Sequence, residues 1–315
     1  EESRKAVEFA HDLGKKVYVT VNIFAHNDDI AELPEYLIAL EGAGVDALLI
    51  SDFGVWSIAR QTVPNMSLHV STQANTCNWA AADSWQKLGA ERVVLARELS
   101  IAEIAEINNK CDVELEVFVH GAMCISYSGR CYLSSYLTGR DGNRGECAQA
   151  CRWNYALVEQ NRPEQEFAIE EDARGTYIMN SKDLCLLDFL PELMEAGVDS
   201  LKIEGRMKSV HYVATVVSVY RKAIDEWYKD PDNFAVKEEW KAELEKVSHR
   251  PYHYGFAVDK PDQKGQIYTT SSYEQTHDFV GLVLSYDADT KIANIEQRNR
   301  VKNKKKLEVL MPDGE

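Results

Sequence analysis

Short apolar segments alternate with amphipathic segments up to about residue 230, and this rhythm constrains the fold more than any other feature. The stretches GAGVDALLI, LGAERVVLA and AGVDSLKIE each put a glycine before an apolar run, an order typical of a helix C-cap followed by a buried parallel strand. Repeated β–α steps predict an α/β fold with a parallel sheet. The predicted strands are Lys16–Asn22, Ala47–Ser51, Leu68–Thr72, Arg92–Ala96, Leu115–His120 and Ser200–Glu204. The predicted helices are Ile30–Gly42, Val55–Val63, Asn78–Leu88, Ile101–Asn109, Leu186–Gly197 and Tyr212–Tyr228.

Polar side chains at the carboxyl ends of these strands favour one version of such a sheet. A (β/α)8 barrel concentrates its chemistry there, and no glycine-rich phosphate fingerprint of a dinucleotide-binding sheet follows any strand. The sequence therefore predicts a TIM-like (β/α)8 barrel. Its N-terminal units are expected to be missing from this chain, because the first residues already read as a helix without an initiating Met. The polar strand ends are Asn22, Ser51, Gln73, Arg97, His120 and Glu204.

One connection is far longer than a βα loop requires. A cysteine-rich insertion is expected at about residues 121–199, before the last strand of the barrel, and an insertion at that end of a barrel is usually functional. After about residue 245 the alternating runs DFVGLVLSY and KIANIEQ predict β-hairpins. The expected domains are an incomplete barrel over residues 1–245 and the start of a small C-terminal β-domain over residues 246–315.

Composition limits the partners. The 315 residues carry a net charge of −16, which argues against coating nucleic acid through global electrostatics. Two local basic runs, Lys202–Lys208 and Arg298–Lys306, leave contact with RNA open. No run of about eighteen apolar residues occurs, so no membrane contact is expected. Seven cysteines in a chain of this size do not resemble a secreted disulfide scaffold, and a reducing cytoplasm is expected.

The residues most able to bind a cofactor are concentrated in the block HGAMCISYSGRCYLSSYLTGRDGNRGECAQACRWNY, which begins at His120. Cys124, Cys131, Cys147 and Cys151 follow the spacing C-x6-C-x15-C-x3-C, and Cys185 comes later. Clustered thiolates suit zinc or an iron–sulfur cluster, although this spacing matches neither a zinc ribbon nor a bacterial ferredoxin. The sequence favours a bound cofactor, with the fourth ligand open between Cys151 and Cys185.

Three further residues are candidates for the site. His120 ends a strand, so its imidazole is expected in the barrel mouth near Cys124 as a metal ligand, a general base or a substrate contact. Glu204 and Arg206, in KIEGRMK, suit an anionic small molecule that Arg206 would grip. There is neither an HExxH helix nor a G-x-S-x-G elbow. Cys124 with His120 could form a thiol nucleophile, but a group of cysteines favours a cofactor.

At these residues the chain closely resembles the peptidase U32 family, often labelled collagenase-like proteases. The cysteine block, NSKDLC at 180–185 and SLKIEGRMKS at 200–209 carry the resemblance, which covers essentially the whole chain. Its best match is the branch that forms 5-hydroxyuridine in tRNA and has a C-terminal β-domain. Several branches look like oxygen-independent or prephenate-dependent hydroxylation proteins with cysteine-bound iron–sulfur clusters.

The resemblance implies cluster ligands among Cys124, Cys131 and Cys147, and it leaves Cys185 and Cys151 open as the fourth. It also implies that zinc can be held between subunits, which would place His120 and a cysteine at a homodimer contact. The leading hypothesis is an enzyme that uses a 4Fe–4S cluster, and prephenate as an anionic co-substrate, to hydroxylate uridine 34 of tRNA. The alternatives are a metal-dependent collagenase-like peptidase, and a zinc-stapled module that binds peptide or RNA.

Overall fold

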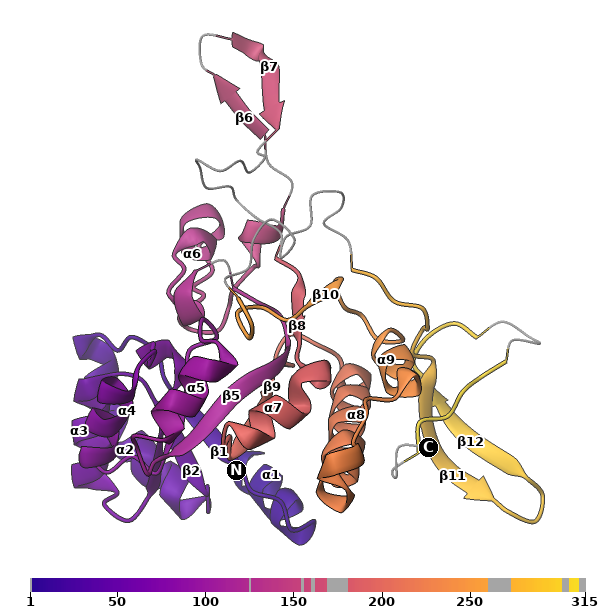
Figure 1. Cartoon of the computed structure of the whole chain (residues 1–315), viewed down its shortest axis with the longest axis horizontal. Coiled ribbons are helices and arrows are strands. Elements are labelled where there is room, and N and C mark those ends of the chain that lie inside the picture. Colours follow the sequence, from indigo (N-terminus) through magenta and orange to yellow (C-terminus); the bar gives the residue numbers. More distant parts are fainter. Residues whose placement is uncertain are drawn as a thin grey trace.

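The structure is a computed structural model that describes residues 2–124, 126–153, 156–159, 162–168, 181–259, 273–301 and 306–311. The described strands form one main sheet and two small two-stranded sheets, and helices pack around the main sheet (Figure 1). No described helix is long and apolar enough to cross a bilayer.

The main sheet confirms the predicted α/β architecture. Strands β1 to β5 are neighbours in chain order and pair in parallel, and β9 pairs in parallel with β5. Their carboxyl ends therefore meet along one edge. At that edge the end of β5 also pairs antiparallel with β8, and β8 pairs in parallel with β10. The strands are β1 Tyr18–Val21, β2 Ala47–Ile50, β3 Ser67–Val70, β4 Arg92–Val94, β5 Glu114–Gly121, β8 Asp183–Cys185, β9 Ser200–Ile203 and β10 Tyr252–His253.

The sheet is open within the described residues. No pairing there joins β1 to β9 or β10, so the closed (β/α)8 barrel stays a prediction. All six strands recognised in the sequence are present, whereas β8 and β10 were not predicted. Strand β10 lies beyond the predicted boundary at residue 245 but belongs to the main sheet.

The helices follow from local sequence signals. Ser100 and Glu103 form a reciprocal capping box at the start of α5, and the Ser209 hydroxyl accepts the N–H of Tyr212 at the start of α8. In α2 the apolar positions Leu33, Leu37 and Leu40 are buried at helical spacing. The helices are α1 Glu2–Asp12, α2 Asn27–Gly42, α3 Phe53–Thr62, α4 Trp79–Lys87, α5 Ile101–Asn108, α6 Leu133–Thr138, α7 Leu190–Glu195, α8 Val210–Lys229 and α9 Glu238–Leu244.

One continuous core holds these layers together. Leu48, Ile50, Leu68 and Leu115 are completely buried in neighbouring strands. Burying a side chain of this size stabilises a fold by about 1.5–3 kcal/mol. The core thus fixes the strand ends on which the candidate site is built.

The long connection between β5 and β9 carries α6, the antiparallel hairpin of β6 (Ala156–Glu159) and β7 (Arg162–Ala168), and then β8 and α7. In Figure 1 this hairpin projects away from the rest of the chain, beyond α6. Short 3-10 turns η2 (Tyr127–Gly129) and η3 (Ala150–Arg152) flank α6 in the sequence. The predicted C-terminal hairpin is confirmed as antiparallel β11 (Gly281–Asp287) and β12 (Ile292–Gln297). Residues 302–305 of the predicted basic run lie outside the described residues.

Candidate functional site

The site is built on the carboxyl ends of β4, β5 and β9. Arg97 follows β4, and its guanidinium lies 3.7 Å from the carboxylate of Glu204, which follows β9. The guanidinium carbon also lies 3.6 Å from the centre of the Phe118 ring on β5. Gly121 allows the backbone of Glu204 to approach β5 closely, because a Cβ at Gly121 would lie 2.5 Å from the carbonyl oxygen of Glu204.

Arg97 is a buried cation with few partners. Its side chain is only 10 % exposed. Its guanidinium forms a loose ion pair with Glu204 and no hydrogen bond to any described residue. Burial lowers the pKa of Arg97, whereas Glu204, Cys124 and Glu98 act to raise it. Cys124 is therefore close enough to this guanidinium for the two groups to interact electrostatically. A buried guanidinium without hydrogen-bond acceptors is costly unless an anion joins it.

Arg97 also lines a pocket whose walls are otherwise mostly apolar. The empty space around Arg97, counted together with the open solvent at its mouth, is about 360 Å³. Other lining residues include Leu99, Ile101, Phe118 and Tyr254. One cation among apolar walls attracts a negatively charged group such as a carboxylate.

His120 is placed differently from the sequence expectation. Its side chain is 1 % exposed and lies among the rings of Tyr212, Tyr220 and Tyr252, with centroid distances of 6.0, 5.6 and 5.1 Å. Burial, with a smaller effect of His249 and Lys208, lowers the pKa of His120 to about 3. The imidazole is therefore neutral at neutral pH and is buried in the core, not open in the mouth of the site.

Cys131 and Cys147 both lie against Gly142. A Cβ built on Gly142 would lie 3.6 Å from Cys147 Cβ and 3.8 Å from the carbonyl oxygen of Cys131. The Sγ of Cys131 accepts the N–H of Leu133 at 3.4 Å, and the Sγ of Cys147 accepts the N–H of Gln149 at 3.3 Å. Hydrogen bonds from amides to sulfur are also found at cysteine-bound clusters, whose potential they tune.

Cys185 and Cys151 belong to other elements. Cys185 is the strand partner of His120, and burial raises the pKa of its thiol to about 11. Cys151 lies in η3 and is half-buried. Among the described residues, no three His, Cys, Asp or Glu side chains form a group that could hold a metal ion. The cofactor ligands therefore stay a prediction, and the structure does not distinguish Cys151 from Cys185 as the fourth.

The loop that carries Cys147 is fixed from two sides. Arg144 donates to both carboxylate oxygens of Asp29 in α2, at 2.9 to 3.1 Å, and Asn143 Oδ1 accepts the N–H of Phe24 at 2.8 Å. The guanidinium of Arg206 lies directly against Gly145, which has φ +82°. Arg206 therefore supports the cysteine loop, while Arg97 is the better placed of the two for a buried anion.

A second anchor fixes the turn between Cys124 and Cys131. The Glu98 carboxylate accepts the N–H of Ser128 at 3.0 Å and its hydroxyl at 2.8 Å. Ser128 has φ +31°, a backbone conformation that serine rarely adopts. The sequence predicts Arg97 as a polar strand end, but it does not indicate this role of Glu98 or the anchors Asp29 and Asn143. Their polar character was the only signal.

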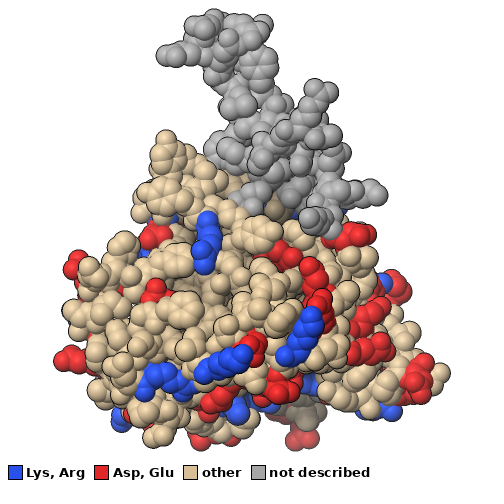
Figure 2. Space-filling view, turned by 60° about the vertical axis from the view of Figure 1, so that its left-hand side comes forward, with Lys and Arg blue, Asp and Glu red and all other residues tan. Residues whose placement is uncertain are grey.

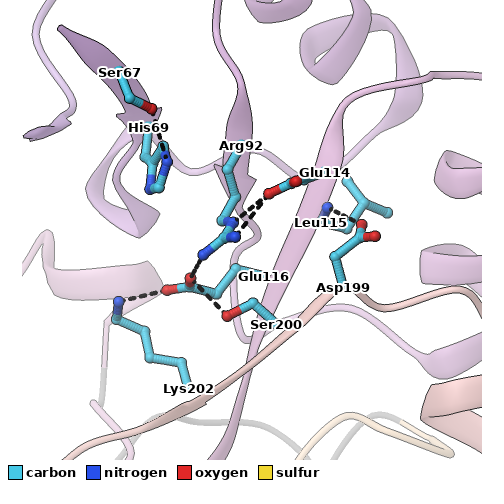
Figure 3. A network of polar contacts seen from close by, with 9 residues as sticks. All are labelled: Ser67, His69, Arg92, Glu114, Leu115, Glu116, Asp199, Ser200 and Lys202. Atoms are coloured by element: carbon cyan, nitrogen blue, oxygen red, sulfur yellow. Dashed lines mark hydrogen bonds and ion pairs between the residues drawn. The ribbon is translucent and has the colours of Figure 1, made fainter. Parts of the chain in front are cut away.

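A separate polar network lies at the opposite ends of the strands, as Figure 3 shows. Glu116 on β5 accepts from Lys202 at 2.5 Å, from Ser200 at 3.0 Å and from Arg92 at 3.2 Å. Burial acts to raise the pKa of Glu116, but Lys202, Ser200 and Arg92 outweigh it and lower that pKa. Arg92 also binds Glu114 at 2.7 Å. Because its charges are paired with one another, this network stabilises the sheet.

Comparison with known proteins shows the family to which the chain belongs. The profile of "Peptidase family U32" matches residues 1–267, and that of "Peptidase family U32 C-terminal domain" matches residues 275–315. The tRNA hydroxylation protein P1 of Bacillus subtilis is 47 % identical over 315 residues, which cover 100 % of this chain and 74 % of that protein. The tRNA hydroxylation protein P of Escherichia coli is 38 % identical over 97 % of this chain and 76 % of its own length. The 23S rRNA 5-hydroxycytidine C2501 synthase of E. coli is 37 % identical over 70 % of this chain and 32 % of its own length. The chain therefore belongs to peptidase family U32.

Proposed function

We propose that this protein takes part in the 5-hydroxylation of uridine 34 in tRNA. The names of its relatives support hydroxylation of RNA. The structural observation that carries the proposal is the pair Cys131 and Cys147, with sulfurs already bound by amide donors. This pair belongs to the loops that adjoin the Arg97–Glu204 strand ends, so a thiolate-bound cofactor and a small anion would share one site.

The proposed cofactor is a 4Fe–4S cluster, with zinc as the alternative. Soft thiolates suit either metal, and a cluster would supply one-electron chemistry when bound. The thiol chemistry of Cys131 and Cys147 fits the group, and we propose these two cysteines as ligands. We assign the remaining positions to Cys124 and to either Cys185 or Cys151. The high thiol pKa of Cys185 means that metal binding there must displace a proton.

The proposed co-substrate is prephenate, a small ring-bearing acid. Arg97 would bind a carboxylate, because it is a buried cation that lines a largely apolar pocket. Glu204 lies beside Arg97, where it would hold the guanidinium in place and limit the number of negative charges accepted. Arg206 would act on the cysteine loop through Gly145.

A peptidase is the alternative that the family label suggests, but the geometry does not favour it. A thiol peptidase needs a basic imidazole beside its cysteine. The pKa of His120 is lowered to about 3, and the thiol of its strand partner Cys185 has a pKa raised to about 11. Burial of His120 also speaks against a zinc-bridged homodimer or a peptide-binding role through this residue.

Two broader expectations go with this proposal. The consecutive parallel order of β1 to β5 supports a TIM-like (β/α)8 barrel. A tRNA substrate supports a cytoplasmic site of action.

The test is the 5-hydroxyuridine content of tRNA from a strain that lacks the gene. The nucleoside should disappear, and it should return with the wild-type gene but not with Cys131→Ala. A Cys77→Ala copy is the matched control, because Cys77 lies outside the cysteine block. Unchanged tRNA in the deletion strain would reject the proposed function.

A further inference from the structure

Large aromatic side chains are exposed beside the cysteine pair. Tyr132 and Tyr136 are 75 % and 76 % exposed. Tyr132 is the N-cap of α6 and Tyr136 lies four residues further on within it, a spacing that points two side chains to the same side of a helix. Trp153, at the end of η3, is 48 % exposed. Helix α6 contacts η3, and Ser134 Oγ of α6 accepts the N–H of Ala148 at 2.9 Å. The three rings are therefore carried by two elements that pack together.

Two exposed arginines flank these rings. Arg130 and Arg140 are exposed and form no ion pair with any described residue, whereas Arg144 in the same block is paired with Asp29. Residues 126–153 contain four arginines and two acidic residues, which gives this segment +2 in a chain of −16. Tyr132, Tyr136, Trp153, Arg130 and Arg140 together are called the aromatic–arginine surface below.

The surroundings make this surface distinctive. In Figure 1, α6 lies in the upper part of the molecule, and in Figure 2 many charged side chains gather along the lower part of the described surface. Acidic side chains elsewhere repel a polyanion, so RNA would meet this chain where the local charge is positive. Exposed aromatic rings accept unpaired bases by stacking, and arginines contact the phosphates between them.

We propose that the aromatic–arginine surface holds unpaired bases of an RNA loop next to the cysteine pair. Cys131 lies between Arg130 and Tyr132 in the sequence, and its sulfur accepts the N–H of Leu133 in α6. Bases stacked on Tyr132 and Tyr136 would therefore bring a neighbouring nucleotide to the strand-end site. The assignment rests on the proposed function for the identity of the RNA, an anticodon loop. It differs from the sequence expectation, which gave RNA contact to the basic runs.

The test is binding of a fluorescently labelled anticodon stem–loop RNA to the full chain, followed by polarisation. The double variant Tyr132→Ala/Tyr136→Ala should bind at least about tenfold more weakly, as expected when stacking on aromatic rings is lost. Tyr132→Phe/Tyr136→Phe keeps both rings and should stay within about twofold of wild type. Phe9→Ala/Tyr228→Ala removes two equally exposed rings from α1 and α8 and is the matched control.

Two further measurements separate stacking from charge. Arg130→Gln and Arg140→Gln should each lower the slope of log Kd against log salt by about 0.7, the value for one phosphate of a single strand. A 2-aminopurine placed in the loop should be quenched by the wild type and by the Phe variant, but not by the Ala variant.

Equal binding by the wild type and the Ala variant, or equal affinity for the loop and for a blunt duplex, would overturn the assignment. A change of oligomeric state in the Ala variant with unchanged RNA affinity would overturn it too and identify a protein interface. Because binding is measured without turnover, a chain that binds the loop through this surface but leaves cellular tRNA unchanged contradicts the proposed function alone.

Discussion

The guanidinium of Arg97 and the carboxylate of Glu204 lie 3.7 Å apart and join the ends of β4 and β9. This contact is too long for a hydrogen bond, so the donors of Arg97 remain available to an anion. The pair thus places one positive charge at the pocket, while the side chain of Glu204 remains about one-third exposed to solvent.

Arg97→Gln should therefore lower 5-hydroxyuridine in tRNA at least about tenfold, because loss of a charged hydrogen bond costs about 1.5–3 kcal/mol. The same substitution should change the free energy of unfolding by only about 1 kcal/mol, because Glu204 is partly solvated and loses little when its partner is removed. Nucleoside mass spectrometry and urea unfolding give the two quantities. Arg221→Gln, at an exposed pair with Asp225, is the control. Full activity of Arg97→Gln would exclude Arg97 from anion binding.

The network around Glu116 should act on stability. Glu116→Gln leaves Lys202 without its partner and weakens the hold on Arg92, so the free energy of unfolding should fall by about 3 kcal/mol. Glu114→Gln removes an exposed partner of the same Arg92 and should cost less than about 1 kcal/mol. Urea denaturation compares the two variants. Equal losses would show that burial of Glu116 does not set its contribution.

Because His69 is buried, we expect the folded state to lose stability in acid. Burial, with a smaller effect of Arg92, lowers the pKa of His69 from 6.5 to about 4. Between these two values the unfolded chain binds a proton that the folded chain does not, so stability is present above pH 6.5 and is lost as the pH falls towards 4. The loss approaches about 1.4 kcal/mol per pH unit. His69→Gln should flatten the dependence of urea unfolding on pH over this window, and an unchanged slope would contradict the assignment.

Gly145 should control access to Cys147. Alanine there meets the Arg206 guanidinium as well as an unfavourable φ of +82°, so the loop must shift and alkylation of Cys147 should accelerate by roughly tenfold, as for a local opening made about 1.4 kcal/mol easier. Gly139→Ala is the matched control, because Gly139 has φ +70° but nothing within 4 Å of an added Cβ. Alkylation is followed by peptide mass spectrometry. Gly145→Ala/Arg206→Ala should return part of the way to the wild-type rate, and equal rates in the two single variants would reject the contact.

The strands and helices could be predicted because their signals are local. Alternation and glycine caps fix β1 to β5 and β9, and the polar residues at their ends led to Arg97 and Glu204. Strands β8 and β10, with three and two residues, show no periodicity to recognise. The environment of His120 depends on Tyr212 and Tyr220 of α8, far along the chain, and nothing near His120 indicates that it is buried. Likewise the meeting of Cys131 and Cys147 at Gly142 depends on the fold of the loop and not on their spacing.

Cys131 and Cys147 are proposed to belong to a cofactor site and not to a peptidase nucleophile. Iron, zinc and acid-labile sulfide should be measured on anaerobically purified protein, together with a visible spectrum, for the wild type and Cys131→Ala. The wild type should contain iron and sulfide in near-equal amounts, and the variant should lack both. Zinc alone, or iron and sulfide that persist in Cys131→Ala, would contradict it.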